Sequence, residues 1–230
     1  MNAPLVPTIR LQELGDAAAV RDVIGHAFEA EPEVVALEEA LAQRADSTGY
    51  VALVDGGVVG HVRLTRGWID AEARLVEVLV LSPLSVAPGW QRRGVGRALV
   101  DHAVAEARRA GVPAVFLEGD PGYYARLGWQ PASELGVTPP SARIPEAACQ
   151  AVQLAAWRPW MGGALVYADT FWALDCVGLR GARLARAPRR PEGVGRVATV
   201  ETRAVAVGLS LAILLGRSSR CPMGRDKRQL

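Results

Sequence analysis

Cysteine and metal-ligand patterns are scarce in this sequence. The three cysteines contain no C-x-x-C pair and are odd in number, so neither a disulfide framework nor a zinc site is predicted. His26, His61 and His102 stand in separate segments without ligand spacing, and structural roles are the default for all three. We therefore expect no bound metal. A reducing, cytoplasmic location fits this cysteine usage.

Long apolar runs are also missing. The run from 204 to 216, AVAVGLSLAILLG, has 13 residues and is shorter than the roughly 20 that span a bilayer. The first residues, MNAPLVP, contain two prolines and no basic flank before an apolar run, which is unlike a secretory signal. We expect neither a membrane span nor export.

Charge is unevenly distributed along the chain. Residues 180–230 hold 12 of the 26 Lys and Arg residues but only 3 of the 24 Asp and Glu residues. This split predicts a folded domain over 1–179 and a basic tail over 180–230. The tail's short apolar segment is expected to dock or to be disordered rather than to enter a membrane. The tail has no aromatic residue to stack on bases, and no specific nucleic acid is expected as a partner.

Hydrophobic periodicity predicts a mixed α/β domain. Two helices lead, the first capped by Asp16 and the second beginning at PEVV. YVALV and VVGHVRL around Asp55-Gly56-Gly57 predict a β-hairpin, and LVEVLVLSPLSV predicts a long strand with a bulge at Pro83. A helix over about 94–110 and the strand AVFLE follow, then a short helix in GDPGYYARLGW and a late pair of strands, VQLAAW with GALVYAD.

The stretch from Val86 to Val100, VAPGWQRRGVGRALV, places two arginines and a Gly-Val-Gly turn directly before the long helix. A helix N-terminus leaves N–H groups unpaired and carries partial positive charge, and glycine lets a ligand approach the main chain. The pattern therefore predicts a seat for a phosphorylated ligand. A Walker loop is disfavoured because Val95 stands where its lysine belongs. A dinucleotide fingerprint is disfavoured because Leu99 stands where its third glycine belongs.

The pattern that fits this stretch is Q-x-x-G-x-G, made by Gln91, Gly94 and Gly96 between a strand and a helix. With P-L-x-V-x-P before the loop and G-D-P-x-Y-Y after the next strand, the sequence resembles the GNAT superfamily of acyl-CoA-dependent N-acyltransferases, and within it a bacterial subgroup of predicted acetyltransferases. The resemblance covers roughly residues 9–175. It implies an α/β (α+β) fold with a mixed central sheet, splayed strands and flanking helices, followed by the basic tail.

The resemblance also implies a co-substrate and a reaction. Acetyl-CoA is expected to place its pyrophosphate on the main-chain N–H groups of the turn and its pantetheine arm along the preceding strand. A neutral amine, on a small molecule or a peptide, then attacks the acetyl carbonyl directly. Tyr124, four residues before Gly128 in YYARLGW, is the implied general acid for the departing thiolate. The implied cofactor-binding residues are Leu84, Ser85, Val86, Gln91, Arg92, Arg93, Gly94, Val95, Gly96 and Arg97.

Several alternatives stay open at this point. Glu77 is a candidate general base on the long strand, although an acid there is more often only solvated. Cys149 has no identifiable His partner and is not expected to act as a nucleophile. The chain is expected to act alone or as a homodimer. The rival function is a catalytically silent CoA-sensing or nucleic-acid-binding module that works through its basic tail.

Overall fold

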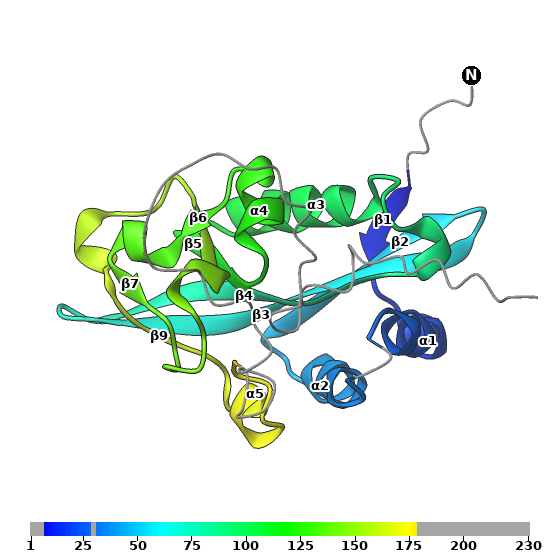
Figure 1. Ribbon diagram of the computed structural model, residues 1–230, viewed down its shortest axis with the longest axis horizontal. Coiled ribbons are helices and arrows are strands. Elements are labelled where there is room, and N and C mark those ends of the chain that lie inside the picture. Colours follow the sequence, from blue (N-terminus) through cyan, green and yellow to red (C-terminus); the bar gives the residue numbers. More distant parts are fainter. Residues whose placement is uncertain (1–6, 29–30, 179–230) are drawn as a thin grey trace, which may run out of the picture.

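The computed structural model describes residues 7–28 and 31–178, and Figure 1 shows them as one mixed sheet with helices on both faces. The basic tail, with its apolar segment, lies outside the described residues. The main path of the sheet runs in the order β1-β2-β3-β4-β5-β8-β6, and β9 joins β3 to β7. The strands on this path are β1 (Thr8–Leu11), β2 (Ser47–Val54), β3 (Gly57–Ala71), β4 (Leu75–Val86), β5 (Ala114–Glu118), β8 (Cys149–Gln153) and β6 (Gln130–Pro131). The two others are β7 (Val137–Thr138) and β9 (Gly163–Val166).

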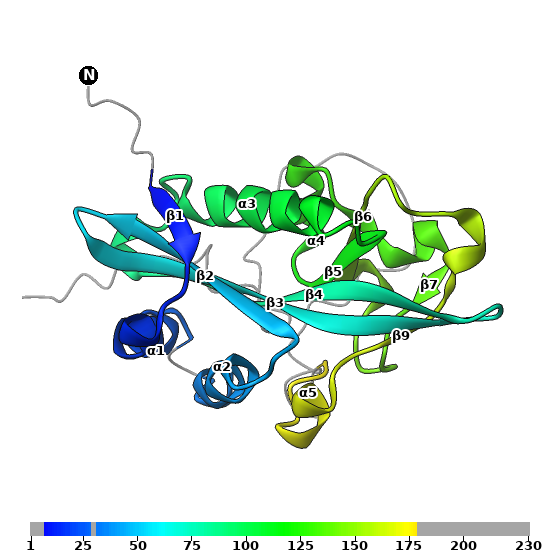
Figure 2. The same cartoon turned by 180° about the vertical axis from the view of Figure 1, so that it is seen from behind.

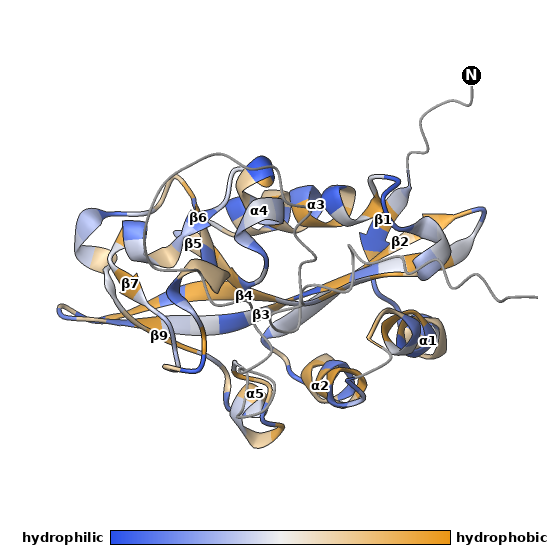
Figure 3. Cartoon of the chain, in the orientation of Figure 1, coloured by the Kyte–Doolittle hydropathy of each residue, from blue (hydrophilic) through white to orange (hydrophobic). Residues whose placement is uncertain are grey.

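Helices cover the two faces of the sheet in separate layers (Figures 1 and 2). α1 (Ala17–Ala27), α2 (Glu33–Ala42) and α5 (Asp169–Ala173) lie on one face, while α3 (Val95–Arg109) and α4 (Pro121–Tyr124) lie on the other. We call these the α1/α2 face and the α3 face. Each face has its own buried hydrophobic cluster, and Figure 3 shows the strands between the layers rich in hydrophobic residues.

The central strands separate part of the way along the sheet. β4 pairs with β5 in parallel at Leu79–Val115 and Val80–Phe116 only. Beyond these two pairs β4 continues to Val86 along β3, whereas β5 continues along β8. The splayed strands expected from the resemblance are therefore confirmed, and residues 81–86 have a strand partner on one side only within the described part of the chain.

A bulge in β4 coincides with the start of this separation. The register between β3 and β4 shifts between Val62 and Leu64, so Ser82 and Pro83 together oppose Arg63. Proline cannot donate to a ladder, and an extra residue bends a strand and can re-aim its side chains. The expectation of a bulge at Pro83 is confirmed.

The late strands differ from the expectation. The strand expected at VQLAAW is β8, which begins three residues earlier at Cys149 and pairs with β5 and β6. The strand expected at GALVYAD is β9, which pairs with β3 and β7 rather than with β8. Four short elements, β1, β6, β7 and α5, were not expected at all. Partners of short strands are decided by tertiary packing, which local patterns do not encode.

Candidate active site

The turn between β4 and helix α3 spans residues 87–94 and includes a short 3-10 helix, Pro88–Trp90. A glycine stands where α3 begins. Gly94 is the N-cap of α3 with a φ of +88°, in the left-handed region that glycine adopts without strain, and no side chain caps the helix. No described residue beyond its neighbours has an atom within 4 Å of where a Cβ of Gly94 would lie. The first N–H groups of a helix lack intrahelical partners and carry the positive end of its dipole. The turn thus offers an open surface for an anion.

The turn is fixed to the free edge of β4. Leu84, Ser85 and Val86 are fully buried, and the Gln91 side-chain amide donates to the Val86 carbonyl oxygen at 3.1 Å. Val95 and Gly96 are buried where α3 starts. This bond holds the Q-x-x-G-x-G turn directly beyond the unpaired edge, so the structure brings the expected strand and turn residues together.

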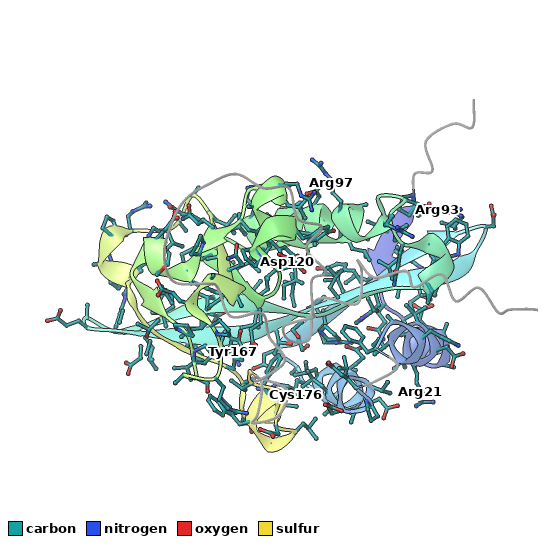
Figure 4. All side chains as sticks on the ribbon, viewed as in Figure 1. Arg21, Arg93, Arg97, Asp120, Tyr167 and Cys176 are labelled. Atoms are coloured by element: carbon teal, nitrogen blue, oxygen red, sulfur yellow. The ribbon has the colours of Figure 1, made fainter. Side chains whose placement is uncertain are left out.

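The three expected arginines lie around this turn but do not converge on one point. Arg92 and Arg93 are exposed, with Arg92 at a φ of +58° and the Arg93 guanidinium 5.3 Å from the centre of the Trp90 ring. Arg97 is ion-paired with Asp101 at 3.4 Å across one helical turn. Figure 4 places Arg93 and Arg97 on the α3 face of the sheet. The three arginines give the turn a positively charged surface but do not form one fixed anion-binding site.

Tyr124 lies on the same face, at the end of α4. Asp120 starts this short helix by accepting from the Gly122 N–H at 2.7 Å. The Tyr124 ring is fully buried and makes edge-to-face contacts with Tyr123 and Trp129, at centroid distances of 4.9 and 5.6 Å. A Cβ on Gly119 would lie 2.3 Å from that ring, so glycine is needed where β5 ends. The ring belongs to the same hydrophobic cluster as Leu84 and Val86.

Comparison with known proteins supports the resemblance. Residues 17–129 match the model of the Acetyltransferase (GNAT) family. The uncharacterized N-acetyltransferase YjhQ of Escherichia coli K12 is 33% identical over 143 residues, which are 60% of this chain and 78% of that protein. The chain belongs to the GNAT family. It is accordingly an acyl-CoA-dependent acetyltransferase.

Two solved GNAT structures share the fold. The crystal structure of Escherichia coli YhbS in complex with CoA has a TM-score of 0.66 at 24% identity, and the match covers 74% of this chain and 94% of that one. A GNAT acetyltransferase from Brucella melitensis in complex with acetyl-CoA has a TM-score of 0.58 at 28% identity, covering 72% and 98%. At 24% identity, the match to YhbS shows a shared fold alone.

The α1/α2 face of this GNAT domain holds a buried polar cluster that the sequence did not reveal. The Arg63 guanidinium donates twice to the Glu38 carboxylate, each time at 2.6 Å, and once to Gln12 Oε1 at 2.6 Å. His61 Nε2 lies 3.2 Å from Gln12 Oε1 and 3.3 Å from Glu38 Oε1. Both neighbours are acceptors, so Nε2 carries the proton, and burial lowers the pKa of His61 to about 4. Nδ1 has no hydrogen-bond partner within the described residues.

A second buried acid, Glu118, ends strand β5 on the α1/α2 face. It is 6% exposed. Burial raises its pKa to about 7, while the Gly178 N–H, the Tyr167 hydroxyl and the charge of Arg143 favour its ionised form. Sequence reasoning noted Glu118 only as part of the turn before Pro121. AVFLE is apolar up to Glu118 and buried on both faces, so its pattern does not show which face Glu118 takes.

The two other candidates, Glu77 and Cys149, lie outside the turn between β4 and α3. Glu77 pairs with Trp68 on the closed part of β4, its side chain is half exposed, and its carboxylate is 3.8 Å from Arg66. The pKa of Cys149 is raised to about 12, first by burial and then by Glu118, so a thiolate is disfavoured.

Among residues 7–28 and 31–178, no group of three or more His, Cys, Asp or Glu side chains is arranged to hold a metal ion. No helix in the same part of the chain has the length and hydropathy of a membrane span.

Proposed function

We propose that this GNAT enzyme transfers the acetyl group of acetyl-CoA directly to a primary amine, without a covalent enzyme intermediate. One observation carries the proposal: β4 leaves β5 after Val80–Phe116 and runs directly into the open N-terminus of α3 at Gly94. An extended pantetheine arm can hydrogen-bond to a free strand edge, and a pyrophosphate suits the helix N-terminus beyond it.

In the proposed reaction, the residues near the point where β4 and β5 separate have different roles. The free edge from Leu84 to Val86 aligns the thioester, and a main-chain N–H of the bulged strand polarises its carbonyl oxygen. Tyr124 lies on the α3 face beside this edge and donates a proton to the departing thiolate. The acetyl-CoA complex of the Brucella melitensis relative, which shares the fold, supports the choice of donor.

Turnover with a panel of amines tests the proposal. Thiol release from acetyl-CoA is measured with polyamines, aminosugars, amino acids and N-terminal peptides as acceptors, and CoA binding is measured by calorimetry. We expect CoA binding by the protein alone and thiol release above background with at least one amine. A chain that binds no CoA and releases no thiol with any amine would contradict the proposed function. A mobility shift of mixed DNA that weakens with salt would instead favour the rival binding module.

A further inference from the structure

Glu118 and Ser82 stand at equivalent positions beyond the last residue pair that joins β4 to β5. The last registered pair is Val80 with Phe116, and Ser82 and Glu118 each stand two residues further along their strands. Side chains alternate along a strand. Val80 and Phe116 belong to the cluster on the α1/α2 face, and Leu81 and Leu117 to the cluster on the α3 face, so Ser82 and Glu118 both turn toward the α1/α2 face.

The Ser82 hydroxyl is an unsatisfied polar group in this part of β4. Ser82 is 6% exposed, and its Oγ is buried without a hydrogen-bond partner in the described part of the chain. Leaving such a group unpaired costs stability, and buried polar atoms in native proteins nearly always have a partner. The bulge at Ser82 and Pro83 places this hydroxyl at the part of β4 where pairing with β5 has ended.

Several groups surround the Glu118 carboxylate. The Gly178 N–H, the Tyr167 hydroxyl and the Arg143 guanidinium favour its charged form. The Cys149 thiol lies beside it through the register of β5 with β8. Figure 4 shows Tyr167 and Cys176 on the α1/α2 face, away from Asp120 and the arginines of the turn. Burial raises the pKa of this carboxyl to about 7, so it can exchange a proton near neutral pH.

We propose that Glu118 accepts the proton of the acceptor ammonium and that Ser82 Oγ orients its nitrogen, which rests on the proposed transfer to an amine. An N–H bond of the ammonium breaks and an O–H bond forms on the Glu118 carboxylate. The neutral nitrogen attacks the acetyl carbon, the C–S bond breaks, and the thiolate takes the proton of Tyr124. The nitrogen, positively charged after the attack, loses a second N–H proton, which restores Tyr124 by way of water, and Glu118 releases its own proton to solvent. The balance is acetyl-CoA and ammonium in, and amide, CoA thiol and one proton out.

The two proton-transfer groups stand on opposite faces of the same strand end. Glu118 is the last residue of β5, and Gly119, which follows it, packs against the Tyr124 ring. The acid therefore serves the thiol on the α3 face while the base serves the amine on the α1/α2 face.

Glu118→Gln tests the base directly, with Glu77→Gln as the matched control on the closed part of β4. With an aliphatic amine from the panel, we expect kcat/KM of Glu118→Gln at pH 7 to fall by about 10²–10⁴, and to rise with pH without the plateau of the parent. With aniline, an aromatic amine added to the panel, which is neutral at pH 7 and needs no base before it attacks, we expect a loss of only a few fold. Glu77→Gln should match the parent in all three measurements.

Two further measurements keep the test decisive. Carbon-13 NMR of the unmodified protein with CoA bound should show a glutamate carboxyl titrating near pH 7 that Glu118→Gln removes. Ser82→Ala should raise KM for the aliphatic amine several fold and leave the pH profile unchanged. The proposal is overturned if Glu118→Gln keeps the parent pH profile, or if Glu118 stays ionised from pH 5 to 8. A purely structural role for Glu118 would lower the melting temperature and spare the pH profile. Loss of CoA binding in the parent would instead contradict the proposed function.

Discussion

At the scale of single residues, Tyr124 is the proposed proton donor to the departing thiolate. Its ring is buried between Tyr123 and Trp129, and Tyr124→Phe removes only the hydroxyl and keeps this packing. We expect the chemical step to slow by about 10²–10⁴, while CoA affinity and melting temperature change little. Single-turnover transfer to a panel amine measures the step without interference from product release.

The matched control for this change is Tyr123→Phe, which removes a hydroxyl from the neighbouring, partly buried ring. It should transfer acetyl at nearly the parent rate. A Tyr124→Phe variant that is as fast as the parent in single turnover would exclude Tyr124 and make solvent the proton source.

His61 makes stability depend on pH. Its pKa is about 4 in the folded protein, lowered first by burial from an ordinary 6.5. Between pH 4 and 6.5, His61 is protonated in the unfolded chain but neutral in the folded chain. The free energy of unfolding therefore has its full value above pH 6.5 and falls as the pH drops toward 4. The loss at pH 4 is on the order of 3 kcal/mol. Denaturant unfolding gives the free energy of unfolding of the parent and of His61→Gln at each pH from 4 to 7. This free energy should change less with pH in the variant, although the variant is less stable overall. The same pH dependence in both proteins would show that His61 does not cause it.

At the scale of elements, the turn into α3 is the proposed phosphate seat. Gly94→Asp adds a side chain and a negative charge where the helix dipole favours an anion. Aspartate tolerates a positive φ better than most residues, so the fold should survive while CoA affinity drops by at least 100-fold in calorimetry. Gly111→Asp is the matched control, because Gly111 also has a positive φ, of +74°, and lies at the other end of the helix. CoA affinity equal to that of the parent in Gly94→Asp would remove the turn from the binding site.

The elements differ in how far the sequence determines them. The strand over AVFLE and the helix after Gly94 were predicted to within a residue, because a short apolar run, helical periodicity and the glycines at both ends of the helix act locally. The late strands were paired wrongly because two- to five-residue strands have little pattern of their own. The equivalent positions of Glu118 and Ser82 beyond the last pair of β4 with β5 were not predicted, because they depend on where these strands stop pairing. The ion pair of Glu38 with Arg63 joins a helix to a strand 25 residues away, and no short-range signal marks it.

At the scale of the whole molecule, the proposed reaction gives the two faces of the sheet separate tasks. The α3 face carries the glycine turn, the exposed arginines and Tyr124, which suit a phosphorylated thiol donor. The α1/α2 face carries Glu118, the base proposed for the acceptor ammonium. β4 and β5 stop pairing beyond Val80–Phe116, between the two faces. The proposed reaction places the thioester and the amine at this point of the sheet.

The domain boundary gives the last prediction. Both hydrophobic clusters are built from residues between Ile9 and Val177, and every proposed site residue lies in the same part of the chain. We propose that residues 1–179 form the complete catalytic unit. A chain that ends at Leu179 should then melt within a few degrees of the full chain and turn over acetyl-CoA within a few fold of it, measured side by side with the same amine. If the shortened chain is insoluble or unfolded, the apolar segment 204–216 completes the core. If it folds but loses turnover, the basic tail takes part in binding the acceptor, and the acceptor then carries negative charge as well as an amine.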